Sequence, residues 1–551
     1  MSDYTIEVNM DKICSVCGQN GVLDNGMCLT CANRSMEDAV RDRIAQEEKE
    51  INQTPENNVI NGKFIEKCLY ENSLGDATLY AAMFRDKFLY CKGQQEWYAW
   101  DEHRWRLDVM DESSVAVEAI AKKYLDEFFV SNKEIASMAE AGADKSDIKK
   151  LQNKCEKLTE RARQLRGPNR RSQCLNFVHT IKDPLAISGT EFDNQPMLFP
   201  CANGVIDLET GRLLNGNPRD YLCASSPIEY HGIADPPELF IKSLCEMHNC
   251  DGPYDDHAMV DYIQRLLGYA ITGFSHEKVF PIFYGKSGWN GRSLILETVK
   301  TILGSMAAPI PSEMLLSQKI AKSASGPSPD VMSLKGLRIA FASETDENQR
   351  FSAAKIKWYT GNNELIGRWP NDKRPIRFNP THTLILETNY QPAAPANDRS
   401  FWERVHLIPF NLSYVNRDPR EPHERRADLK LREKLIPEYS KILGWLVEGC
   451  LKWQREGINP PQIVTEATAK YRADEDMLGD FIDECCVREP LAKEKGSGLY
   501  NRFVSWYHDN HGAKEPSGTW FGKQLGQKYE KNKSDGVIVY HGLRLNDLEM
   551  K

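Results

Sequence analysis

The chain has 551 residues, which is too long for a single hydrophobic core and predicts three or four domains. Hydrophobic residues make up 41% of the chain and charged residues 27%, as in water-soluble globular proteins. No apolar run approaches the roughly 18 residues that a membrane span needs, and the N-terminus lacks the features of a signal peptide. We therefore expect a cytoplasmic protein without a membrane segment. The net charge of −9 does not exclude nucleic-acid binding, which needs only a local basic surface.

Two matched cysteine pairs lie near the N-terminus, at Cys14 and Cys17 and at Cys28 and Cys31. Each C-x₂-C pair places two thiolates on one metal, and four thiolates suit tetrahedral Zn²⁺ in a structural site. The spacing predicts a zinc ribbon over residues 1–35, whereas a redox pair or unrelated thiols would not explain two matched pairs. Its task is left open between DNA contact, docking of a partner and stability alone. Residues 36–60 are acidic and are expected to form a linker.

Residues 61–235 are expected to form a domain of mixed helix and strand. Within it, hydrophobic or small residues recur at helical spacing, which predicts a helix that ends at Gly167-Pro168. These residues are Ile148, Leu151, Cys155, Leu158, Ala162 and Leu165. Ten Lys or Arg against three acids between Lys145 and Arg171 make this segment basic. A solvated amphipathic helix is the favoured interpretation, and a helix that guides DNA or joins subunits is the alternative.

Residues 236–430 have an α/β pattern with four short apolar strand candidates, VFPIFY, LRIAFAS, HTLILET and VHLIPF. The first leads into GKSGWNGRS and then into a helical pattern. A strand, a glycine-rich turn and a helix are typical of a phosphate-binding loop, in which Gly285, Gly288 and Gly291 allow close approach and Ser293 would hold Mg²⁺. Two features depart from the consensus: the loop is one residue longer, and the expected lysine is Arg292. A glycine-rich surface turn is the alternative.

Further polar residues follow the later strand candidates in order. Glu344 ends the strand LRIAFASE, where a rigid carboxylate could serve Mg²⁺ binding and water activation. Asn389 ends HTLILETN and could orient the attacking water. Arg399 and Arg404 follow, and either could stabilise the γ-phosphate charge on a neighbouring subunit, although a surface salt bridge is the ordinary role of a single arginine.

The stretch from Leu266 to Phe410 resembles the superfamily 3 helicases of the AAA+ class, and among them the phage, plasmid and poxvirus primase-helicase family. The similar segments include RLLGYAITG, YGKSGWNGRS, LKGLRIAFASETDENQR, RFNPTHTLILETNYQP and DRSFWERVHLIPF. The resemblance extends over about residues 95–545. It implies a multidomain α/β protein with an AAA+ P-loop NTPase core that binds ATP and Mg²⁺ in the cytoplasm of a host cell.

The resemblance also implies roles for single residues. The nucleotide-binding loop would comprise Gly285, Gly288, Asn290, Gly291, Arg292 and Ser293. Ser293 and Glu344 would serve Mg²⁺, with Glu344 as the catalytic carboxylate, Asn389 as the sensor and Arg404 as the finger-region arginine.

DNA binding is expected at two places. The resemblance implies a ring, usually a hexamer, that passes single-stranded DNA through its pore, with Trp369, Lys373 and Arg374 at the pore hairpin. An ordinary exposed turn is the alternative for that segment. After a helical connector at residues 431–469, residues 470–551 are expected to form a compact helical domain ending in a hairpin. The resemblance implies a winged-helix-like domain there, which could contact origin duplex DNA through residues 520–533.

The sequence thus predicts an ATP-dependent DNA helicase for replication of a phage or mobile element. The alternative is an ATP-binding replication initiator or loader with weak hydrolysis, because Arg292 replaces the usual lysine. Residues 61–235 show no paired acidic strand motif for nucleotidyl transfer, so we expect no primer synthesis by this chain alone and consider a separate primase or polymerase partner.

Overall fold

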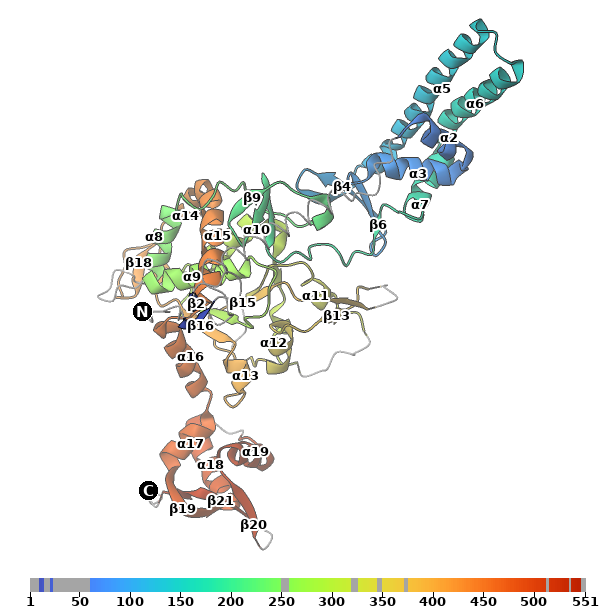
Figure 1. Cartoon of the computed structure of the whole chain (residues 1–551). Coiled ribbons are helices and arrows are strands. Elements are labelled where there is room, and N and C mark those ends of the chain that lie inside the picture. Colours follow the sequence, from blue (N-terminus) through green and yellow to red (C-terminus); the bar gives the residue numbers. More distant parts are fainter. Residues whose placement is uncertain are drawn as a thin grey trace. The chain divides into compact units, whose positions relative to one another are not determined.

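The computed structural model describes residues 9–13, 20–22, 60–248, 257–318, 326–343, 349–370, 375–511, 515–534 and 537–546. The chain divides into two compact units, residues 1–85 with 110–186, and residues 86–109 with 187–551 (Figure 1). The expected domain of residues 61–235 therefore contributes to both units. Over the described ranges, no helix has the length and apolar character of a membrane span.

The first unit is helical apart from a short antiparallel strand pair. The strands are β1 (Asn9–Ile13) and β2 (Asn20–Val22). The helices are α2 (Gly62–Tyr70), α3 (Asn72–Phe84), α4 (Glu112–Val115), α5 (Val117–Glu140), α6 (Lys145–Leu165) and α7 (Pro168–Val178). Helices α5 and α6 lie side by side as a long hairpin (Figure 1).

A buried carboxylate holds this unit together. Asp76 on α3 is fully buried, and its oxygens accept hydrogen bonds from Arg161 Nη1 at 2.9 Å, Arg170 Nε at 2.7 Å and the Tyr124 hydroxyl at 2.9 Å. These donors come from α6, α7 and α5. A buried ion is tolerated only when it is fully paired, so the cluster fixes how the four helices pack.

The predicted basic helix is confirmed as α6, which ends at Leu165, just before Gly167-Pro168. Cys155, Leu158, Ala162 and Leu165 on its apolar face are buried. Most of its cations and those of the following turn are paired within the unit. The acceptor acids are Asp76, Glu66, Glu127, Glu118, Glu160 and Asp147. These pairs favour a structural role for the helix over a DNA guide.

The second unit begins with two small sheets, in which β3, β4 and β5 pair antiparallel, as do β7, β8 and β9. The first has the order β5-β4-β3-β6, with β3 (Phe88–Cys91), β4 (Glu96–Asp101), β5 (Arg104–Leu107) and β6 (Ala186–Ile187). The second has the order β7-β8-β9, with β7 (Leu198–Cys201), β8 (Gly204–Asp207) and β9 (Arg212–Leu214).

A five-stranded parallel sheet forms the centre of the second unit, in the order β11-β12-β15-β10-β16. Its strands are β11 (Ala307–Ile310), β12 (Ile339–Ser343), β15 (Thr383–Thr388), β10 (Phe280–Tyr284) and β16 (Val405–Pro409). The four predicted strands are therefore confirmed. They are mostly apolar because both faces of a parallel sheet are covered.

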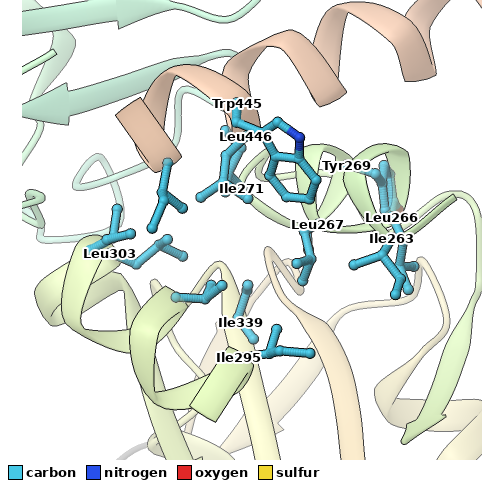
Figure 2. Packing of buried hydrophobic residues seen from close by; sticks show 14 of the residues in the cluster. Ile263, Leu266, Leu267, Tyr269, Ile271, Ile295, Leu303, Ile339, Trp445 and Leu446 are labelled. Atoms are coloured by element: carbon cyan, nitrogen blue, oxygen red, sulfur yellow. The ribbon is translucent and has the colours of Figure 1, made fainter. Parts of the chain in front are cut away.

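Alternate residues of each strand enter two different hydrophobic cores. On β12, Ile339 and Phe341 join one core, and Ala340 and Ala342 join the other. Figure 2 shows the first core, where Ile339 lies near Ile295 and side chains from two further helices complete the cluster. The three helices are α9 (His257–Ala270), α10 (Arg292–Leu303) and α15 (Tyr439–Glu456). Helix α10 starts at the carboxyl ends of the strands, directly after β10 and the glycine-rich segment.

The remaining elements of this region surround the sheet. Its helices are α8 (Glu238–Met247), α11 (Pro329–Met332), α12 (Ala353–Tyr359), α13 (Arg399–Trp402), α14 (Leu431–Leu435) and α16 (Gln462–Asp474). Strands β13 (Leu365–Gly367) and β14 (Ile376–Phe378) pair antiparallel, and β17 (Ser413–Val415) and β18 (Glu424–Arg426) pair parallel.

The C-terminal part has its own core and the element order helix, strand, helix, helix, strand, strand. The elements are α17 (Met477–Cys485), β19 (Cys486–Lys495), α18 (Gly496–His511), α19 (Gly518–Lys528), β20 (Lys531–Ser534) and β21 (Val537–Leu545). The three strands pair antiparallel in the order β19-β21-β20. The terminal hairpin β20–β21 is confirmed. Strand β19 was not predicted, because most of its residues are charged or exposed.

Candidate nucleotide site

The glycine-rich segment connects the end of β10 to the first turn of α10, as the sequence predicts. Gly291 caps α10 with φ of +89°, a left-handed conformation that favours glycine. Gly285 is confined as well, because a Cβ there would lie 2.1 Å from the Asn290 amide nitrogen and 2.7 Å from the Phe410 carbonyl oxygen. This turn leads into the N-terminus of α10, and the N–H groups of a helix's first turn favour an anion.

The loop is held from inside and from outside. The buried Asn290 side chain donates to the Ser287 carbonyl at 2.7 Å and so bridges the loop. Strand β17 fixes the tip of the loop through two hydrogen bonds. Ser413 Oγ donates to the Gly288 carbonyl at 3.1 Å, and the Tyr414 N–H donates to the Trp289 carbonyl at 2.7 Å. These bonds give the loop a defined shape without a ligand.

Arg292 is buried, and its guanidinium crosses from the loop to the neighbouring strand. Its Nε donates to Asn290 Oδ1 at 2.8 Å, and Nη2 donates to Asn389 Oδ1 at 2.6 Å. Its Nη1 donates to the carbonyls of Phe283, at 3.1 Å, and Thr388. Burial lowers the pKa of Arg292, and the nearby Glu387 opposes that shift. The side chain thus joins the predicted loop to the predicted sensor Asn389.

An acidic residue that the sequence analysis missed lies beside the loop hydroxyl. Ser293 Oγ donates to Glu387 Oε1 at 2.5 Å, and Arg292 Nε lies 4.0 Å from the same oxygen. Glu387 is on β15, directly opposite Ser343 at the end of β12. Its sequence signal is a lone acid inside the otherwise apolar run HTLILET. The predicted catalytic Glu344 lies outside the described residues.

These residues line one pocket of about 720 Å³. The loop from Gly288 to Ser293 forms one wall, and Ser343, Glu387 and Asn389 stand at the strand ends. The remaining wall mixes apolar and aromatic groups with charged ones; the apolar and aromatic groups include Met247, Tyr414, Leu429 and Leu431, and the charged groups include Glu246, Asp428 and Arg432. Polar groups at the start of a helix can serve the phosphates of a nucleotide, and apolar groups of the same pocket can contact its base.

The two candidate finger arginines are placed differently. Arg399 has a side chain that is 85% exposed, and it donates to Glu403 Oε1 at 2.7 Å. Arg404 is half-buried, and it donates to the Ser400 carbonyl. Its Nε is buried without a hydrogen-bond partner among the described residues. Arg399 is therefore the more accessible of the two, and Arg404 remains the finger-region arginine that the resemblance implies.

The predicted DNA-binding and zinc residues are described only in part. The antiparallel pair β13–β14 flanks the segment of the predicted pore hairpin, and Trp369 between them is 43% exposed. Lys373 and Arg374 lie outside the described residues, as do the four cysteines Cys14, Cys17, Cys28 and Cys31.

Comparison with known proteins finds viral relatives. Residues 77–249 match the family model described as "D5 N terminal like". The chain is 26% identical to "Putative helicase L207/L206" of Acanthamoeba polyphaga mimivirus, over 76% of this chain and 44% of that protein. It is 23% identical to "Putative helicase 022R" of Frog virus 3, over 60% of this chain and 41% of that protein. It is 21% identical to "Primase D5" of Fowlpox virus, over 48% and 35% respectively.

The chain spans less than half the length of these curated relatives. Among solved structures, the apo structure of the NrS-1 C-terminal region is similar at a TM-score of 0.34 and 13% identity, covering 57% of this chain and 78% of that one. The sequence similarities are thus to viral proteins named as putative helicases and as a primase, and to the "D5 N terminal like" model.

Proposed function

We propose that this chain is an ATP-dependent DNA helicase that acts in replication of a phage or related mobile element. One observation carries the proposal. The glycine-rich loop starts α10 at the carboxyl edge of a parallel sheet, with Ser293 facing Glu387 and with Asn389 beside Arg292. Phosphates at a helix N-terminus, a hydroxyl and a carboxylate for Mg²⁺, and a polar group for water are the parts that ATP hydrolysis requires.

The fold supports the finer assignment to the AAA+ class and to superfamily 3. The loop-bearing strand β10 lies between β15 and β16 in an all-parallel five-stranded sheet, and the strands that carry Ser343 and Glu387 follow on one side. The order helix, strand, helix, helix, strand, strand at residues 477–545 supports a winged-helix-like C-terminal domain. That domain would contact origin duplex DNA.

We further propose a homo-oligomeric ring, with a hexamer as the expected form, that passes single-stranded DNA through its pore. Two observations support it: Arg399 is exposed, as a residue that reaches a neighbouring subunit must be, and the exposed Trp369 lies between the paired strands β13 and β14. The N-terminal cysteines would bind Zn²⁺ as a structural ribbon. A separate primase or polymerase is a further expected partner, in the cytoplasm of the host cell.

ATP hydrolysis with and without single-stranded DNA tests the proposal. The wild-type chain should hydrolyse ATP faster when DNA is added, and Glu344→Gln should abolish turnover while nucleotide binding persists. Glu466→Gln, an exposed position on α16, is the charge-matched control and should behave as wild type. Near-zero rates in the wild type with normal nucleotide binding would exclude a motor.

That last result would favour the second candidate, a replication initiator or loader that binds ATP with weak or no hydrolysis. The observation behind it is Arg292, whose guanidinium is engaged by four acceptors inside the protein. An arginine held in this way is less available to a γ-phosphate than the usual flexible lysine.

A further inference from the structure

An acidic residue, Glu387, lies beside the loop on β15 and not at the end of β12. In P-loop NTPases, Mg²⁺ is held by the hydroxyl of the loop and by a carboxylate at the end of a neighbouring strand. In this chain β12 ends at Ser343, which offers only a hydroxyl. The acid stands one strand over, at Glu387 of β15, in direct register with Ser343.

Glu387 faces the loop rather than a distant partner. Its Oε1 accepts the hydrogen bond of Ser293 Oγ at 2.5 Å, and its side chain is 13% exposed, on the wall of the pocket. Arg292 Nε, 4.0 Å away, is already committed to Asn290. A carboxylate on the pocket wall is therefore set beside the loop hydroxyl.

We propose that Glu387 supplies the strand carboxylate of the Mg²⁺ site, in the role that an acid at position 343 would otherwise have. The inference rests on the proposed ATP site and adds a residue to it. With Glu387 and Ser293 serving the metal, Glu344 is left to activate water.

The chemistry of the donors fits Mg²⁺. This ion prefers oxygen ligands and takes one or two carboxylates together with the phosphates of its nucleotide, so a single protein carboxylate suffices. Adjacent oxygens around an octahedral Mg²⁺ lie about 3 Å apart, given metal–oxygen distances of about 2.1 Å. The Ser293–Glu387 pair would need to open by roughly 0.5 Å, which a small rotation of the glutamate side chain provides.

Binding of a fluorescent ATP analogue to the full chain, in Mg²⁺ and in EDTA, tests the proposal without relying on turnover. Glu387→Ala and the isosteric Glu387→Gln should weaken binding in Mg²⁺ by at least about 10-fold, since loss of even a residue that only supports a metal ligand costs about 10- to 100-fold. Both should bind as wild type does in EDTA. The double variant Ser343→Asp/Glu387→Ala returns an acid to the neighbouring strand and should restore Mg²⁺-dependent binding. Glu466→Gln is the control.

The outcomes separate the two levels of the argument. Loss of affinity confined to Mg²⁺, with recovery in the double variant, supports the proposal. Equal weakening in EDTA, unchanged binding in Mg²⁺, or no recovery in the double variant would overturn it while leaving an ATP site in place. If the wild-type chain binds no nucleotide under either condition, the proposed function itself fails.

Discussion

Arg292→Lys gives the sharpest test of how the loop works. The arginine fork serves four acceptors on three separate segments: Asn290, the carbonyls of Phe283 and Thr388, and Asn389. A lysine has one nitrogen on a flexible chain and cannot span these positions. Loss of two hydrogen bonds from a charged donor, at about 1.5–3 kcal/mol each, should cost about 3 kcal/mol or more even without nucleotide.

Thermal unfolding of the nucleotide-free protein measures this effect directly. At about 2 °C per kcal/mol for a large domain, the midpoint should fall by roughly 6 °C. ATP hydrolysis should also fall, because Asn389 loses the donor that orients it. A lysine variant that is as stable as wild type and hydrolyses ATP faster would refute this reasoning. Arg292 would then be a simple phosphate-binding cation in place of lysine.

Three further predictions concern other parts of the chain. Asp76→Ala should destabilise the helical unit by about 3–5 kcal/mol in denaturant unfolding, because Arg161 stays buried without its carboxylate. Glu118→Ala, which breaks the exposed pair with Arg166, should change the free energy of unfolding little. Equal losses of stability in the Asp76 and Glu118 variants would contradict the argument. Burial lowers the pKa of His248, His382 and His406 to about 4. As the pH falls, these histidines take up protons in the unfolded chain before they do so in the folded protein. Their contribution to the free energy of unfolding should therefore be complete above about pH 6.5 and fall by about 2 kcal/mol per histidine at pH 5. A flat unfolding midpoint between pH 7 and 5 would count against this. Trp369→Ala should weaken binding of a labelled single-stranded oligonucleotide by about 1–3 kcal/mol if the ring stacks on a base, and unchanged affinity would remove it from the DNA path.

Local patterns in the sequence were sufficient for four of the five strands of the central sheet and for the loop, whereas the edge strand β11 was not predicted. Apolar runs such as VFPIFY predict buried strands, and the glycines that follow predict a turn into a helix. The order and register in which the strands pair could not be predicted in the same way. The pairing of β12 with β15 puts Ser343 opposite Glu387, and no spacing along the chain contains that register.

The sequence pattern also does not predict where a side chain points or which groups it contacts. Arg292 occupies the position of a phosphate-binding cation, yet its partners are carbonyls and amides 9 and 97 residues away in sequence. Arg399 and Arg404 are similar in sequence context, but the packing around α13 leaves one exposed and half-buries the other. Strand β19 was missed because pairing with β21, not an apolar pattern, makes it a strand.

The cluster around Asp76 has a consequence for how such chains can diverge. One carboxylate pairs with both Arg161 and Arg170, so loss of the acid alone leaves two cations without their carboxylate, and loss of one arginine alone leaves the acid with fewer partners. Single steps away from this arrangement are therefore costly, while a joint replacement by apolar residues of similar volume can be neutral. In an alignment of close relatives, these three positions should change together or not at all.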